Sequence, residues 1–345
     1  MKDNMTAEKM MEYLYGLPNQ FVECLKAEFT FMGNYKKRYK NIVVSGLGGS
    51  AIGGDILRSY AENKGNIPVI VNRSYEIPNF VDEKTLFFAV SYSGNTEETL
   101  SAYEKAKNKR ADIICITSGG KLSLMAESDG YGVVKVPSGL VPRAAIGYLF
   151  CPMALILSEL GIFPNLKSEI EETVQVLSEL REEIKPDIVF PDNPARRLAE
   201  SLMDSIPVIW GSIGGTETAA LRFKAQINEN AKSPAYYNVF PELNHNEVVG
   251  FAVPEDILSR VVIVIFEDKY DNPRIKKRID ITEDIVKNRV KNLLRIESRG
   301  ESFLARLFSL IYLGDYASVY LAGRYSINPT PVGVIDYLKA RLSEG

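Results

Sequence analysis

Short apolar runs that recur along the first half of the chain constrain its fold more than any other feature. From Asn41 the runs read NIVVSGLGG, PVIVNRS, TLFFAVSYSG, DIICITSGG and GVVKVPSG, spaced about 20 to 30 residues apart. Turn residues end each run, and helix-length segments separate most of them. Strands that alternate with helices in this way are typical of βαβ units. The pattern therefore predicts a parallel sheet flanked by helices.

The second half of the chain repeats part of this pattern. The segment NIVVSG with Gly48, Gly49 and Ser50 aligns with PVIWGS followed by the turn at residues 214–216. Two more apolar runs follow, YYNVF and VVIVIF, and after them we expect the polar loop EDKYDNPR and amphipathic helices up to the end. We interpret the repeat as two related α/β lobes. The alternative is coincidence, because Gly-Gly after a strand is common in α/β folds.

These patterns predict an α/β fold with two doubly wound lobes. With 345 residues, 46% of them hydrophobic, the chain is long enough to build two cores. We expect a helical segment at residues 1–40 that serves packing and not chemistry, a first lobe at 41–152, a connecting helical segment at 153–190 and a second lobe with the C-terminal helices at 191–345.

Composition argues against several classes of partner and site. A net charge of −3 provides no basic field for nucleic acid. No secretory leader and no membrane-spanning stretch is visible, so a cytoplasmic protein is expected. Cys24, Cys115 and Cys151 are widely separated and odd in number, which fits reduced thiols. A single histidine excludes a multi-histidine metal centre, and no clustered acidic motif favours a carboxylate one. We expect neither a metal nor a cofactor.

Two turns rich in hydroxyl groups indicate a phosphate site. The first turn, SYSGNTEET, supplies Ser91, Ser93 and Thr96, and the turn GLGGSAIGGD supplies Gly49 and Ser50. Hydroxyl groups donate to anionic oxygens, Gly94 lets the backbone come close, and a following helix offers free N–H groups. The alternative for the first turn alone is a helix-capping box with Glu97 or Glu98.

The turn GLGGSAIGGD also matches the dinucleotide-binding fingerprint, but weakly. That fingerprint needs an acidic residue about 20 positions further on, where this chain has Asn72 and Arg73. Arg73 could meet a 2′-phosphate, so an NADP-dependent oxidoreductase remains an alternative. The hydroxyl of Ser50 and the second hydroxyl-rich turn favour a small phosphate instead.

Six motifs in order along the chain are GLGGSAIGGD, SYSGNTEET, PSGLVPRAAIGY, QINENAK, FPELNHNE and PTPVGVIDYLKARL. With them the chain resembles the sugar isomerase (SIS) domain family, and within it the bifunctional phosphoglucose/phosphomannose isomerases. The resemblance implies two Rossmann-like SIS lobes and a homodimer. It also implies metal-independent conversion of glucose 6-phosphate, and of mannose 6-phosphate, to fructose 6-phosphate.

The resemblance also implies roles for single residues. The phosphate cradle is Gly49, Ser50, Ser91, Ser93 and Thr96; the catalytic group is Arg143 as a cation, Glu229 as the general base, His245 as the ring-opening acid and Lys339 as a third proton-handling residue. In this family the histidine reaches the site from the partner subunit. Thr330 lies in the last motif, and no role is assigned to it.

Elementary chemistry agrees with these roles. A hexose 6-phosphate is mainly a closed ring, and a histidine near neutrality suits the proton exchange that opens it. A carboxylate beside the open aldehyde can then carry a proton between C2 and C1 through a cis-enediol. Arg143 would stabilise the enediolate charge without donating its own proton. Read without the resemblance, Glu229 would be a solvated helix residue.

One further alternative is a non-catalytic regulator that binds a sugar phosphate, since SIS domains also occur in transcriptional regulators. The chain shows no appended DNA-binding segment, and it carries the motifs of Glu229, His245 and Lys339. Both observations favour the enzyme.

Overall fold

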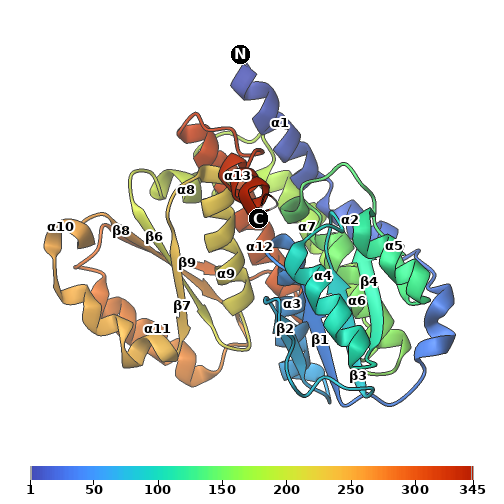
Figure 1. Cartoon of the computed structure of the whole chain (residues 1–345). Coiled ribbons are helices and arrows are strands. Elements are labelled where there is room, and N and C mark those ends of the chain that lie inside the picture. Colours follow the sequence, from blue (N-terminus) through green and yellow to red (C-terminus); the bar gives the residue numbers. More distant parts are fainter. Residues whose placement is uncertain (1, 343, 345) are drawn as a thin grey trace.

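The computed structural model describes residues 2–342 and 344, and within them two parallel β-sheets, each covered by helices, lie side by side (Figure 1). The first sheet has the order β2-β1-β3-β4-β5. Its strands are β1 (Asn41–Ser45), β2 (Val69–Asn72), β3 (Thr85–Val90), β4 (Asp112–Thr117) and β5 (Gly132–Lys135). All five apolar runs of the first half are strands, and every pairing is parallel, as predicted.

The second sheet has the order β7-β6-β8-β9, which repeats the order of the first four strands of the first sheet. Its strands are β6 (Ile206–Ser212), β7 (Tyr236–Phe240), β8 (Val261–Glu267) and β9 (Asn292–Glu297). Strands β1 and β6, the two segments aligned in the sequence, occupy equivalent central positions. The prediction of two related doubly wound lobes is confirmed.

Helices cover both sheets and join them. Those of the first lobe are α3 (Gly49–Lys64), α4 (Glu97–Asn108), α5 (Gly120–Asp129) and α6 (Ile146–Glu159), with a short 3₁₀ turn, η2 (Pro142–Ala144). Those of the second lobe are α8 (Pro194–Ser201), α9 (Glu217–Gln226), α10 (Glu255–Leu258) and α11 (Pro273–Val286), with the π-helical turn η3 (Ile227–Ala231) and the 3₁₀ turns η4 (Glu242–His245) and η5 (Glu247–Ala252). The others are α1 (Lys2–Tyr15), α2 (Leu17–Cys24), η1 (Thr30–Tyr35), α7 (Lys167–Ile184), α12 (Phe303–Arg324) and α13 (Gly333–Leu342).

Helix α12 is the centre of the molecule. It is buried along nearly its whole length and packs against α7, α8, α9 and α1. A helix that is apolar on all sides must be surrounded by protein. One hydrophobic cluster accordingly runs from α2 and α6 through α12 to the second sheet. The N-terminal helices pack into this cluster, as expected for a segment that serves packing.

Two details differ from the sequence analysis. The expectation of helices alone after the polar loop is wrong, because residues 292–297 form the edge strand β9. Edge strands are half-solvated, and the sequence NLLRIE mixes charges with apolar residues, so no clean apolar run marks it. The expected boundary at residue 152 falls inside helix α6.

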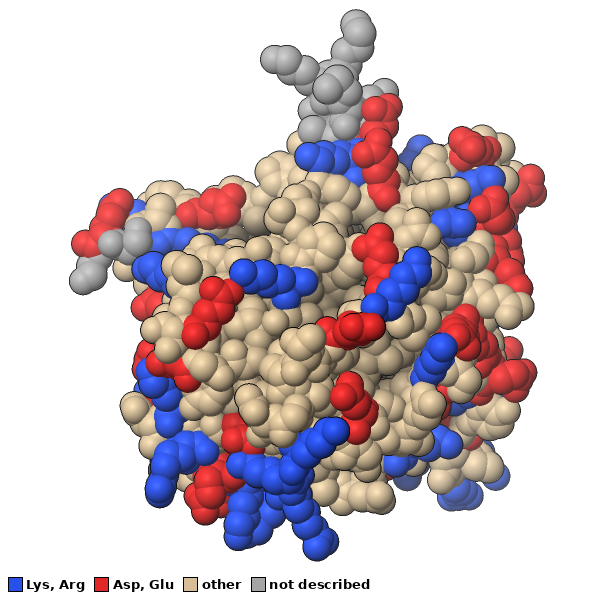
Figure 2. Space-filling model, turned by 90° about the vertical axis from the view of Figure 1, so that its right-hand side faces the viewer, with Lys and Arg blue, Asp and Glu red and all other residues tan. Residues whose placement is uncertain are grey.

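The surface shows no single dominant charge. Acidic and basic side chains alternate over most of the face seen in Figure 2, with a group of Lys and Arg at its lower edge. This mixture agrees with the small net charge of −3. Among the described residues, no helix combines the length and the hydrophobicity needed to cross a bilayer.

The strand order places a crevice at a defined point of each sheet. Strand β1 lies between β2 and β3, so the chain leaves β1 toward one side and leaves β3 toward the other. Ligands of open α/β sheets bind outside the carboxyl ends of the strands at such a switch point. The two hydroxyl-rich turns directly follow β1 and β3, so they meet at this crevice.

We predict that the packing around α12 dominates stability. Phe308 is fully buried, with its ring centroid 4.9 Å from that of Phe21 and 5.4 Å from that of Phe150. Phe308→Ala should lower the free energy of unfolding by about 3 to 5 kcal/mol, because it leaves a cavity in the shared core. Denaturant unfolding measures this loss. The matched control is Phe80→Ala, whose ring is 48% exposed; equal shifts in both variants would contradict the prediction.

Candidate active site

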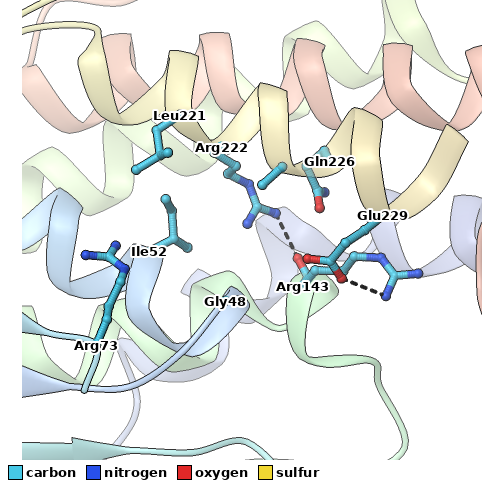
Figure 3. A pocket seen from close by; sticks show the side chains of 10 residues that line it. Gly48, Ile52, Arg73, Arg143, Leu221, Arg222, Gln226 and Glu229 are labelled. Atoms are coloured by element: carbon cyan, nitrogen blue, oxygen red, sulfur yellow. Dashed lines mark hydrogen bonds and ion pairs between the residues drawn. The ribbon is translucent and has the colours of Figure 1, made fainter. Parts of the chain in front are cut away.

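A cavity of about 110 Å³ lies where α3 and η2 of the first lobe face α9 and η3 of the second (Figure 3). The first lobe lines it with Gly48, Gly49, Ile52, Arg73 and Arg143, and the second with Leu221, Arg222, Ala225, Gln226 and Glu229. The cavity adjoins the turn after β1, at the predicted crevice. Three of the predicted site residues, Gly49, Arg143 and Glu229, are therefore brought together.

Arg143 is the buried cation of this cavity. Only 4% of its surface is exposed. Its Nε donates to Oδ1 of Asn230 at 2.8 Å, and its Nη2 donates to the carbonyl oxygens of Pro329 at 2.7 Å and Thr330 at 2.9 Å. Its Nη1 lies 3.4 Å from Oε2 of Glu229. Burial lowers the pKa of Arg143 and Glu229 opposes this effect. A guanidinium stays protonated in proteins, so the site holds a fixed positive charge.

The segment that carries Arg143 is held from two sides. Gln20 of α2 donates from Nε2 to the carbonyl of Ala144 at 2.7 Å, and its Oε1 accepts from the N–H of Gly147 at 3.0 Å. The Tyr92 hydroxyl donates to the carbonyl of Pro137 and accepts from the N–H of Leu140, both at 2.9 Å. Because Tyr92 lies within the first hydroxyl-rich turn, that turn and the Arg143 segment form one unit.

Glu229 projects from a π-helical turn that continues α9. Its side chain is 28% exposed and is directed toward Arg143 (Figure 3). The turn ends at Lys232, whose φ of 55° lies in the left-handed region. π-helical turns and strained residues are frequent at functional sites. The interpretation of Glu229 as an ordinary solvated helix residue does not fit this position.

The ammonium of Lys232 ties the π-helical turn to the C-terminal segment. It donates to the carbonyl oxygens of Glu229 and, at 3.1 Å, of Pro329. Burial, together with the nearby charge of Arg143, lowers the pKa of Lys232. Arg143 and Lys232 therefore hold the same stretch of backbone, just before α13.

Polar groups of α12 support the cavity from beneath, and the sequence analysis missed them. Asp315 accepts from Nε of Arg222 at 3.0 Å and from its Nη2 at 2.7 Å. Arg222 also donates to the carbonyl of Arg143 at 2.8 Å. Ser318 accepts from Asn230 at 2.9 Å. Burial raises the pKa of Asp315, and Arg222 opposes this effect. The sequence signal that could have indicated this role is Asp315 itself, a lone carboxylate within an apolar stretch of helix.

Gly48 and Gly49 of the turn after β1 line the cavity, whereas the hydroxyl residues of both turns are not among its lining residues. Oγ of Ser91 lies 2.8 Å from Oγ1 of Thr96, and Oγ of Ser50 accepts from the N–H of Tyr92 at 3.2 Å. Ser50 and Ser91 are buried, whereas Ser93 is exposed. Thr96 occupies the N-cap position of α4, but its hydroxyl caps no backbone N–H. The capping-box alternative is therefore wrong.

Two glycines permit the close approach of these segments. A side chain at Gly94, where φ is 69°, would come within 1.8 Å of the carbonyl oxygen of Gly119. One at Gly49 would come within 2.8 Å of the backbone nitrogen of Arg143. Glycine is therefore needed at the first position for the turn itself and at the second for contact with the cation.

His245 and Lys339 are not at the cavity of the single chain. His245 ends the exposed turn η4, and Lys339 lies on α13, in which no residue is buried. Their roles, and the arrival of His245 from a partner subunit, stay predictions. Thr330 contributes its backbone carbonyl to Arg143.

The structure also bears on the remaining sequence interpretations. Arg73 lines the cavity, where its guanidinium forms an ion pair with the buried carboxylate of Asp55. Cys24, Cys115 and Cys151 are buried free thiols. No cluster of three or more His, Cys, Asp or Glu side chains suited to a metal ion occurs in the described part of the chain.

The equivalent turn of the second lobe is built differently. The hydroxyl of Thr216 accepts from the N–H of Ser212 at 2.9 Å and donates to the carbonyl of Phe266 at 2.7 Å. A side chain on Gly215 would lie 3.1 Å from the carboxylate of Asp271, and burial raises the pKa of Asp271 to about 6. A carboxylate thus lies beside this turn, where it would repel a phosphate.

Two family models match the chain. One is described as "SIS domain" and matches residues 36–131; the other, "Bacterial phospho-glucose isomerase C-terminal SIS domain", matches residues 191–342. A bifunctional phosphoglucose/phosphomannose isomerase of Caldicellulosiruptor bescii is 52% identical, over 97% of this chain and 99% of that protein. A D-glucosamine-6-phosphate 4-epimerase of Sulfolobus acidocaldarius is 31% identical, over 88% of this chain and 90% of that protein.

A solved structure shares the fold. The crystal structure of a hypothetical protein from Thermus thermophilus superposes with a TM-score of 0.73, covering 97% of this chain and 91% of the other. The two sequences are 16% identical, so this likeness shows the fold alone.

We predict that Asp271 makes stability depend on pH. The folded state raises its pKa from 3.8 to about 6, so the folded protein loses stability as the pH rises through this window, and the cost persists above it. Asp271→Asn should therefore stabilise the protein by about 1 to 3 kcal/mol at pH 8 and by about half as much at pH 5. Denaturant unfolding at the two pH values measures the difference. A gain that is the same at both values, or the same gain in the exposed control Asp256→Asn, would contradict the prediction.

Proposed function

Because the chain belongs to the family of bifunctional phosphoglucose/phosphomannose isomerases, we propose that it converts glucose 6-phosphate and mannose 6-phosphate to fructose 6-phosphate. The single observation that carries the proposal is the position of Glu229. Its carboxylate faces the fixed cation Arg143 in a cavity at the carboxyl end of the first sheet. A base beside a positive charge is what the transfer of a proton between two carbons next to a carbonyl needs.

The phosphate end of the substrate fits the two turns after β1 and β3. Gly48 and Gly49 reach the cavity and begin α3, whose N-terminus favours an anion. We assign the phosphate contacts to the hydroxyl groups of Ser50, Ser91, Ser93 and Thr96, which lie in the two turns that follow β1 and β3. In this arrangement the phosphate lies at the first lobe and the sugar extends toward the second, where Glu229 and Arg143 face each other.

The reaction then follows from the two groups at the cavity. After ring opening, Glu229 removes the proton from C2 and returns it to C1, while Arg143 stabilises the negative charge of the enediolate. Positioned acid–base catalysis contributes roughly 10²- to 10⁴-fold, and a desolvated cation adds to it. We assign ring opening to His245 and a further proton transfer to Lys339.

One base can serve both aldoses. Glucose 6-phosphate and mannose 6-phosphate differ only at C2, which becomes planar in the enediol. Rotation about the C2–C3 bond presents either face of the open sugar to Glu229. Dual specificity therefore requires no second catalytic group.

A homodimer explains why two assigned residues lie away from the cavity. His245 is exposed, and α13, which carries Lys339, presents apolar side chains to solvent, among them Val334 at 85% and Tyr337 at 67% exposure. An exposed apolar helix suggests a surface for protein contact. We propose that a second copy covers this region and contributes His245.

We predict that Glu229→Gln abolishes the reaction without abolishing binding. The variant should bind fructose 6-phosphate with similar affinity but lose about 10³-fold or more in isomerisation of both aldoses, because the amide cannot accept the proton. The same variant should lose exchange of the C2 hydrogen with solvent deuterium, which NMR follows directly.

The assay is run with excess chelator, which also tests metal independence, and Glu104→Gln on the exposed face of α4 serves as the matched control. Retained exchange in Glu229→Gln would remove this residue from its role. Binding without turnover by the wild type would favour the regulator, and epimerisation at C4 would favour the activity named for the Sulfolobus relative. A rise in the thermal midpoint with NADP would favour the oxidoreductase.

We predict that two inactive variants complement each other. If His245 acts across a dimer interface, a mixed dimer of Glu229→Gln and His245→Ala has one site with both groups intact. Equal mixing after subunit exchange should restore about a quarter of the wild-type activity, since about half of the dimers are mixed. If activity does not return in mixed dimers shown to form, both groups act within one chain.

A further inference from the structure

We propose that Gln226 determines specificity by accepting a hydrogen bond from the C3 hydroxyl of the bound hexose 6-phosphate. The inference rests on the proposed function and deepens it. It concerns the side-chain amide of the first residue of the motif QINENAK, to which no role has been given so far and which the proton transfer itself does not use.

Gln226 is directed into the cavity from the helix that carries the base. It is the last residue of α9, and only 2% of its surface is exposed. Figure 3 shows its side chain descending from the helix between Arg222 and Glu229. Gln226 precedes Glu229 by three residues, and both line the cavity.

The orientation of the amide is fixed by its neighbours. Nε2 donates to Oδ1 of Asp315 at 3.0 Å. Asp315 also accepts two hydrogen bonds from Arg222, and this pairing with a guanidinium requires a carboxylate that accepts only. The amino group must therefore face Asp315, which leaves the amide oxygen on the cavity side.

That oxygen has no donor within the described residues. Gln226 contributes one hydrogen bond through Nε2, and none reaches Oε1. It is also not among the fully buried side-chain atoms that lack a partner, so it is accessible from the cavity that Gln226 lines. When a bound ligand displaces water from such an acceptor, leaving it without a new donor is costly. A ligand group that fits here must donate a hydrogen bond, which a sugar hydroxyl does and an ionised phosphate oxygen does not.

Which sugar hydroxyl faces Gln226 follows from the proposed positions of the two ends of the substrate. Glu229 serves C1 and C2, and the phosphate on C6 lies at the turns after β1 and β3. The hydroxyl next to the reacting carbons is the one on C3, and Gln226 lines the same cavity as the base. A fixed C3 would also define the axis of the C2–C3 rotation that dual specificity needs.

The test compares wild type and Gln226→Leu on glucose 6-phosphate and its 3-deoxy analogue. The wild type should prefer the hydroxylated substrate by about 100-fold in kcat/KM, because the analogue displaces water from the amide oxygen without offering it a donor. In Gln226→Leu the preference should fall to within about threefold. Gln175→Leu, an exposed glutamine on α7, is the matched control and should retain the preference.

The ratio of kcat/KM for the two substrates distinguishes a loss of hydroxyl recognition from a general distortion of the site. A variant that is only distorted loses activity on both substrates by the same factor, and that result would overturn the proposal. Should Gln226→Leu fail to fold, the wild type with 3-deoxy and 4-deoxy analogues decides the matter, since a larger loss with the 4-deoxy compound contradicts the assignment to C3. If the wild type does not isomerise glucose 6-phosphate, the proposed function fails; if it does but lacks the preference, only this inference fails.

Discussion

A buried guanidinium holds the arrangement of this protein together. Arg143 belongs to the first lobe, yet its hydrogen bonds end on Asn230 of the second lobe and on backbone carbonyls just before α13. A charge removed from water must find partners in every direction, because an unsatisfied one costs several kcal/mol. One side chain of the first lobe thus contacts both the second lobe and the C-terminal segment at the cavity.

The same α/β pattern occurs twice in the chain and gives each sheet a crevice, but the side chains around the two crevices differ. Both central strands end in a Gly-Gly turn with a hydroxyl residue, and both sheets share one strand order. The Gly-Gly turn after β1 lines the cavity that also contains the cation Arg143 and the base Glu229. In the Gly-Gly turn after β6, the hydroxyl of Thr216 already forms two hydrogen bonds with the backbone, and the carboxylate of Asp271 lies beside the turn. Sequence likeness alone would have assigned both turns the same role.

Much of this architecture could be predicted from periodicity, since parallel strands and turns are local features. The positions of β1 to β8 and the meeting of Gly49, Arg143 and Glu229 at one cavity follow the motifs. The edge strand β9 could not be found, because half of its side chains face water. The hydrogen bonds by which Asp315 and Ser318 support the cavity could not be predicted either, because contacts between α12 and α9 depend on how the helices pack. Nor could the sequence show that His245 and Lys339 lie away from the cavity of the single chain, because the positions of η4 and α13 depend on tertiary packing.

The π-helical turn that presents Glu229 constrains chain length as well as residue type. A π turn contains one residue more than an α-helical turn spanning the same path. Deleting Ile227 or Asn228 would let the regular helix continue and rotate every later side chain, Glu229 included, by about 100°. The carboxylate would then leave the cation even if each neighbouring residue were kept. Insertions and deletions tolerated in surface loops should therefore be excluded from this short segment.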